Sequence, residues 1–131
     1  MSGITDLQQL LRSMKPELTD QVFVFCTVPG NIGDFVSLTP IASFAEQEGL
    51  TLVLARETAE RAGLQFDGVF RQITLTVHSS LAAVGLTAAV AAKLAAKGIS
   101  ANVIAAYYHD HIFVPADRAE AALRALQEFS V

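Results

Sequence analysis

The sequence predicts an α+β fold in which two units form antiparallel sheets with helices on one face, the first unit being truncated. The apolar spacing of residues 70–129 changes in the order strand, helix, strand, strand, helix. Residues 21–62 repeat that order with a long loop in place of the first helix. We therefore expect residues 1–66 to hold an N-terminal helix and a truncated unit, and residues 67–131 a complete unit, together forming one compact body.

The first half begins with an amphipathic helix and an apolar strand. Residues 4–14 carry apolar side chains at helical spacing, and residues 21–28 form a strand that is apolar on both faces. Phe23 and Phe25 share one of these faces, so the N-terminal helix or a second copy of the chain must cover them. A homodimer is the simplest source of that cover.

The remaining elements of the first half are short and are separated by turn residues. They are a loop over residues 29–39, strands over 41–45 and 50–55, and a helix over 56–62. We expect Gly49 to supply a positive φ angle in the hairpin. The helix is supported by a Glu57 and Arg61 pair and ends at Gly63.

The second half is predicted to contain the complete unit. Its elements are a strand over residues 70–78, a helix over 84–97, a hairpin over 101–114 that turns near His109 and Asp110, and a last helix that begins at Pro115. In the first strand the alternation directs Ile73 and Leu75 toward the helices. In the following helix the inner stripe is Val84, Ala88, Ala91, Leu94 and Ala95.

A split β-α-β-β-α arrangement brings segments that are distant in sequence to one end of the sheet. The end of the first strand at His78, the start of the next helix and the hairpin at His109 meet there. We expect His111 and Phe113 to share the wetter face of the sheet with His78. All three histidines of the chain therefore gather at one end.

Three segments carry a family resemblance: LTVHSSLAAVGLT over residues 75–87, GISANV over 98–103 and YYHDHIFV over 107–114. They are similar to a bacterial family of small ACT-domain proteins in which a complete unit follows a shortened one. The chain resembles, more distantly, the regulatory ACT pairs of aspartate kinases. The resemblance implies a ferredoxin-like, ACT-like α/β sandwich with tandem units. It also implies that a small ligand, often an amino acid, binds in the loop after the first strand and at the start of the following helix.

We predict a ligand site for an amino acid or small carboxylate at this end of the sheet. A helix N-terminus offers unpaired N–H groups to a carboxylate, and Gly85 would let the ligand approach the backbone. The alternative is that Ser79 and Ser80 only cap the helix and Gly85 only permits close packing. The predicted ligand-binding residues are His78, Ser79, Ser80, Leu81, Val84, Gly85, Asn102, Val103, His109 and His111.

Two other functions stay open. His78, His109 and His111, with Asp110 nearby, have the residue types of a metal site and would then serve a metal carrier or a metal-dependent enzyme. A pure interaction module would bind no small molecule. The leading interpretation assigns no catalytic residue, no metal and no cofactor, because the chain lacks a nucleophile elbow, a phosphate loop and a dinucleotide fingerprint.

The composition of the chain narrows the possible functions and locations further. The net charge of -4 and the pI of about 5.2 argue against a nucleic-acid surface. The uncharged run over residues 72–92 is interrupted by polar residues and changes its apolar period, so we predict strand, turn and helix rather than a membrane span. Cys26 is expected to be a buried, inert thiol. A lone cysteine without a signal peptide favours a cytoplasmic protein. Together with the resemblance and the apolar strand, we expect a non-catalytic regulatory module that forms a homodimer.

Overall fold

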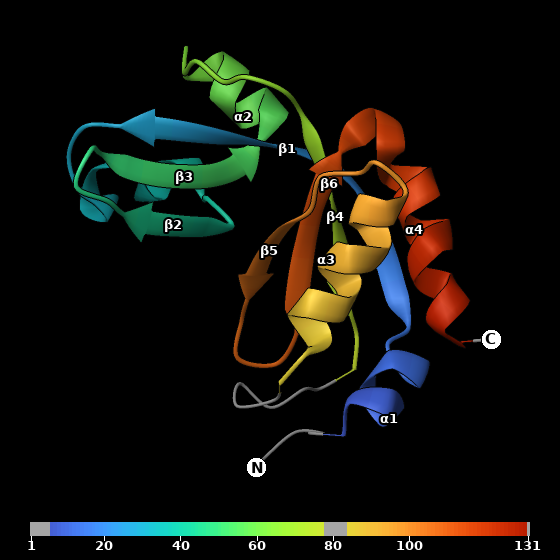
Figure 1. The fold of residues 1–131 in the computed structure, drawn as a ribbon. Helices are drawn as coiled ribbons and strands as arrows, with labels where there is room; N and C mark the ends of the chain where they lie inside the picture. The colour runs from blue at the N-terminus through green and yellow to red at the C-terminus, as the bar shows by residue number, and fades with distance from the viewer. Residues whose placement is uncertain (1–5, 78–83, 131) are drawn as a thin grey trace. The chain divides into compact units, whose positions relative to one another are not determined.

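The computed structural model describes residues 6–77 and 84–130, and contacts divide the chain into two units (Figure 1). The main unit comprises Met1–Asp20 with Arg71–Val131, and the middle unit comprises Gln21–Phe70. The boundary predicted at residues 66 and 67 assigns residues 1–20 to the truncated unit, whereas they make their contacts with the complete one. The reason is that the apolar stripe of the first helix packs into the core of the main unit.

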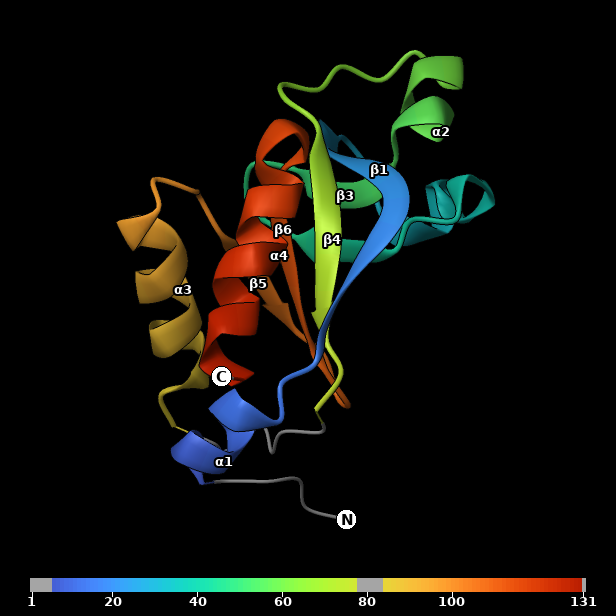
Figure 2. The ribbon, with the colours of Figure 1, turned by 90° about the vertical axis from the view of Figure 1, so that its right-hand side faces the viewer.

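The main unit has the predicted order of strand, helix, strand, strand and helix. Its elements are α1 (Leu7–Arg12), the first residues of β1 (Pro16–Val28), β4 (Phe70–Leu75), α3 (Leu86–Ala96), β5 (Asn102–Ala105), β6 (Asp110–Pro115) and α4 (Ala119–Gln127), with 3₁₀ turns at Ala116–Arg118 and Glu128–Ser130. Its strands lie in the order β1-β4-β6-β5. Figure 2 shows α3 and α4 on one face of this sheet. The α+β class with an antiparallel sheet is thus confirmed.

The core of the main unit lies between its sheet and its helices. Ile73, Leu75, Ile112 and Val114 face the helices, as their alternation predicted. The helices contribute mainly Leu10, Met14, Leu86, Val90, Leu94, Ala122 and Leu126 to this core.

The predicted inner stripe of α3 was wrong except at Leu94. The buried positions are Leu86, Val90 and Leu94, whereas Val84 is 83% exposed. Ala88 and Ala95 are also exposed. Alanines occupy so many positions of this helix that they define no stripe, and the larger branched side chains decide which face is buried.

The hairpin between β5 and β6 turns earlier than predicted. The backbone N–H of Ala106 donates to the carbonyl of His109 at 3.0 Å, so the hairpin turn comprises residues 106–109. Asp110 is already the first residue of β6, and Ile104 pairs with His111. Pro115 ends β6, and a 3₁₀ turn precedes α4, so the proline does not open that helix directly.

Two helices end at the predicted glycines. Gly63 and Gly98 have φ angles of 71° and 72°, the left-handed conformation that glycine adopts without strain. In the second case the N–H of Ile99 donates to the carbonyl of Leu94 at 2.9 Å. This is the hydrogen bond of a Schellman motif, and it satisfies a carbonyl that the helix end leaves unpaired.

The middle unit is a three-stranded antiparallel sheet with one helix. Its elements are the rest of β1, β2 (Ala42–Ala45), β3 (Leu50–Ala55) and α2 (Arg56–Arg61), with 3₁₀ turns at Ile32–Asp34 and Val36–Leu38 in the predicted loop. The strand order is β2-β3-β1, so β2 is an edge strand. Its core comprises Val24, Cys26, Val28, Leu50, Leu52, Leu54 and Ala59.

Two local predictions for the middle unit were wrong. Gly49 does not have a positive φ angle. A Cβ atom there would lie 2.7 Å from Oγ1 of Thr27, so the glycine permits a close approach to β1 instead. The helix ion pair joins Arg56 to Glu60 at 3.3 Å and replaces the expected pair one residue further along.

The surface that needs cover is not the one predicted. Phe23 is only 5% exposed, and the ring of Phe25 packs edge-on against Phe70 with centroids 5.3 Å apart. The large apolar side chains that the middle unit exposes lie in the 3₁₀ turns and around β2. They are Ile32, Val36, Ile41 and Phe44.

Candidate functional site

The segments predicted to meet at one end of the sheet do so where the structure describes them. The end of β4, the start of α3 and the hairpin turn lie at the same end of the main unit in Figures 1 and 2. The helix α1 lies at this end as well. Four of the predicted ligand-binding residues, His78, Ser79, Ser80 and Leu81, fall outside the described residues.

The N-terminal segment closes part of this end. The backbone N–H of Val77 donates to the carbonyl of Met14 at 3.3 Å, and Thr76 Oγ1 donates to the carbonyl of Lys15 at 2.9 Å. Gly85 precedes α3 with a φ angle of 97°, and a Cβ atom there would lie 3.1 Å from Cδ2 of Leu7. The close approach that Gly85 allows is therefore made by α1, and a ligand contact at Gly85 stays a prediction.

A polar cluster lies on the far face of the sheet, which is the face opposite α3 and α4. Nδ1 of His111 is 2.9 Å from Nε2 of Gln72 and 3.0 Å from Oγ1 of Thr74. The same Nε2 also donates to Oγ1 of Thr74 at 3.0 Å. Gln72 is only 7% exposed, and His111 and Thr74 are half-buried. The three side chains are joined across β4 and β6 although they are far apart in sequence.

The environment of His111 keeps its imidazole neutral. Burial lowers the pKa of His111, and the nearby His109 lowers it further, while the Asp110 carboxylate opposes both. The two rings stand nearly perpendicular with centroids 6.5 Å apart. Near neutral pH this ring therefore offers one N–H donor and one acceptor nitrogen.

The other predicted residues lie on different faces. Asn102 pairs with Phe113 across the hairpin, and its Nδ2 donates to the Phe113 carbonyl at 3.2 Å. Val103 packs against the helix-covered core instead, and Val84 is 83% exposed. Phe113 is 1% exposed, so the expectation of a wet surface was wrong at that position. The structure thus brings His109 and His111 together but divides the remaining residues between two sides of the sheet.

The structure bears on the metal hypothesis and on the expected state of Cys26. Within residues 6–77 and 84–130, no group of three or more His, Cys, Asp or Glu side chains is arranged to hold a metal ion. His78, the third histidine of that hypothesis, lies outside those residues. Cys26 is 4% exposed and burial raises the pKa of its thiol, as expected for an inert cysteine.

No helix among the described residues has the length and apolar character needed to span a bilayer.

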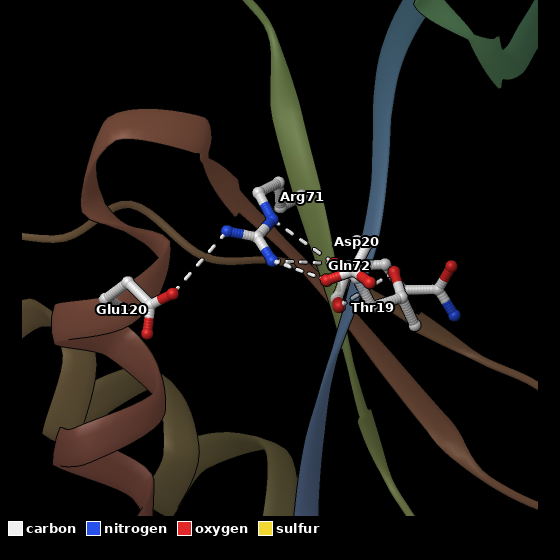
Figure 3. Close-up of polar contacts among 5 residues, drawn as sticks. All are labelled: Thr19, Asp20, Arg71, Gln72 and Glu120. Atoms are coloured by element: carbon white, nitrogen blue, oxygen red, sulfur yellow. Dashed lines mark hydrogen bonds and ion pairs between the residues drawn. The ribbon is translucent and has the colours of Figure 1, made fainter.

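Sequence reasoning missed a second polar cluster, centred on Arg71 (Figure 3). Its Nε and one terminal nitrogen donate to the carbonyl of Thr19 at 3.2 and 3.0 Å. The guanidinium also lies 3.7 Å from Asp20 and 3.8 Å from Glu120. Arg71 therefore connects the start of β1 with β4 and α4. The only sequence signal was an arginine inside an otherwise uncharged strand.

Solved structures place the chain among known folds. A protein of unknown function from Vibrio cholerae, described as a possible transport protein, is 61% identical over 99% of this chain and 100% of its own, with a TM-score of 0.90. The regulatory subunit of aspartate kinase from Thermus thermophilus is 13% identical over 86% of this chain and 95% of its own, with a TM-score of 0.60. A protein from Agrobacterium tumefaciens is 14% identical over 88% and 87%, with a TM-score of 0.67. The last two comparisons show a shared fold.

Sequence profiles identify the family. One profile of the ACT domain matches residues 2–71, and a second ACT domain profile matches residues 69–128. A search of curated proteins gave no match. These matches confirm the family resemblance that we drew from segments of residues 75–114, and they extend over both halves of the chain. The chain belongs to the ACT domain family and carries two ACT domains in tandem.

Proposed function

We propose that this chain is a non-catalytic regulatory module that binds an amino acid or a similar small carboxylate at the hairpin-turn end of the main unit. Membership of the ACT family and the fold shared with a regulatory subunit support the regulatory role. The observation that carries the proposal is the half-buried, neutral His111 on the far face with His109 beside it. An imidazole N–H in that place is a donor for a carboxylate oxygen.

The start of α3 lies at the same end of the sheet and offers further donors to an anion. The first N–H groups of this helix are unpaired within it, and its dipole favours an anion at that terminus. The predicted contacts from residues 78–81, Val84, Gly85, Asn102 and Val103 belong to this proposal. The lone, buried cysteine fits a cytoplasmic protein, and the sequence motifs of common catalytic sites are lacking.

A thermal-shift screen tests the proposal. The protein amino acids and small mono- and dicarboxylates are added singly near neutral pH, with the corresponding amines and amides as controls. A ligand at about a hundred times its Kd stabilises the folded state by roughly 2.7 kcal/mol, which raises Tm by several degrees. We expect at least one carboxylate to do so while its amide does not. A screen in which no carboxylate changes Tm would contradict the proposal.

We also propose that two copies associate through the edge strand β2, where Phe44 is exposed. The strand β2 is at the edge of its sheet, and its Phe44 is 71% exposed. An unpaired strand edge combined with exposed apolar side chains is a surface on which a second copy can add a strand. A twofold axis makes such a contact self-complementary, because the same strand edge serves both partners.

Replacing Phe44 by lysine tests this interface. The charged side chain would be buried without a partner in the dimer, so we expect a shift from dimer to monomer in light scattering coupled to size exclusion. Tyr107→Lys is the matched control, since Tyr107 is 63% exposed at the hairpin turn of the other unit. A wild-type protein that is monomeric at high concentration, or a Phe44→Lys variant that stays dimeric, would contradict the proposal.

A further inference from the structure

Gln72 is the one buried polar side chain among the described residues. Burying a primary amide costs free energy unless its hydrogen bonds are replaced. Here the amide nitrogen donates to Oγ1 of Thr74 at 3.0 Å and lies 2.9 Å from Nδ1 of His111. An apolar side chain of similar size would serve the strand without this cost.

The hydrogen bonds determine where the imidazole carries its proton. An amide nitrogen donates and does not accept, so its contact with Nδ1 of His111 is a hydrogen bond in the tautomer whose Nδ1 carries the lone pair. The hydroxyl of Thr74 lies 3.0 Å from the same atom and can donate to it in the same tautomer. In that tautomer the proton of the neutral ring is on Nε2, which has no hydrogen-bond partner among the described residues.

We propose that Gln72 and Thr74 are positioning residues that hold His111 in its Nε2–H tautomer, so that it donates a hydrogen bond to a carboxylate oxygen of the ligand. This inference rests on the proposed function, because it assigns the donor within that site. It also makes the ligand an acceptor at this position, which distinguishes a carboxylate from an ammonium group.

Lowering the pH should destabilise the Nε2–H tautomer of His111. Protonation puts a hydrogen on Nδ1, which then faces the amide hydrogens of Gln72 unless the amide turns to present its oxygen. The charged or titratable groups that act on the ring are His109, the last residue of the hairpin turn, and Asp110, the first residue of β6. Gln72, Thr74 and Ile104, its neighbours on β4 and β5, carry no charge.

The replacement Gln72→Glu is the sharpest test of the tautomer. The carboxylate has nearly the same shape but accepts hydrogen bonds, so it should draw a proton to Nδ1 and raise the pKa of His111. Long-range ¹H–¹⁵N spectra of the imidazoles report which nitrogen is protonated. We expect an Nε2–H ring in the wild-type protein and an Nδ1-protonated ring in the variant. Gln47→Glu, at an exposed position of the middle unit, should leave the spectrum of His111 unchanged.

Binding is then measured with each protein amino acid as the probe. The one that binds the wild-type protein most tightly should bind at least about tenfold more weakly to Thr74→Val, and Thr74→Ser should restore affinity because it keeps the hydroxyl. An Nδ1–H ring in the wild-type protein overturns the inference, as does unchanged affinity in Thr74→Val. If no amino acid or small carboxylate binds the wild-type protein, the proposed function itself fails, and the positioning role fails with it.

Discussion

Replacing Met14 by alanine is expected to lower the free energy of unfolding by about 2–5 kcal/mol, the usual range for truncating a buried methionine. Met14 is 0% exposed and belongs to the core of the main unit, together with Leu10 of α1. Its carbonyl also accepts from the N–H of Val77, which ties the segment to the end of β4. Urea unfolding followed by circular dichroism measures the change.

The control for this variant is Gln8→Ala, an exposed position on the same helix. It should leave the free energy of unfolding nearly unchanged, because alanine is the better helix former and no core contact is lost. If Met14→Ala costs no more than this control, α1 is not an integral part of the core. The first twenty residues would then not belong to the main unit.

Replacing Arg71 by methionine is expected to cost about 1–3 kcal/mol, since a charged donor is lost from a partly buried carbonyl. The side chain of Arg71 is 19% exposed and makes two hydrogen bonds to the Thr19 carbonyl. Methionine keeps the apolar stem of the side chain but leaves that carbonyl without these donors. Arg124→Met, at an exposed position of α4, is the matched control and should change stability by far less.

Salt distinguishes the two kinds of interaction made by Arg71. The side chains of Asp20 and Glu120 are 109% and 70% exposed, so their ion pairs with Arg71 contribute little and are screened by salt. The cost of Arg71→Met should therefore be nearly the same at low and high salt. A cost that disappears in high salt would show that the ion pairs, and not the Thr19 carbonyl, account for the effect.

Much of the fold was predictable because it follows from local patterns. The alternation in β4 and β6 identified the residues that face the helices, and Gly63 and Gly98 marked the ends of two helices. Such signals depend only on the period of the side chains and on the freedom of glycine. The segment patterns also sufficed to identify the family, which the profile matches confirm.

The missed features depend on contacts between distant residues. Nothing in the pattern of α1 indicates that Leu7 will pack over Gly85, or that the helix will join the core of the main unit. The burial of Gln72 arises only when β4 and β6 lie side by side. The alanine-rich α3 gave the wrong stripe for a different reason, since small side chains carry little information about burial.

Mapping a bound ligand onto the protein tests the central claim most directly. Starting from the carboxylate that raises Tm most in the screen, a titration into ¹⁵N-labelled protein follows each backbone and imidazole resonance. We predict saturable shifts at His109, His111 and the hairpin turn, with no shift along β2 of the middle unit. Shifts confined to the middle unit, or no saturable shift in the main unit, would contradict a carboxylate site at the hairpin-turn end of the sheet.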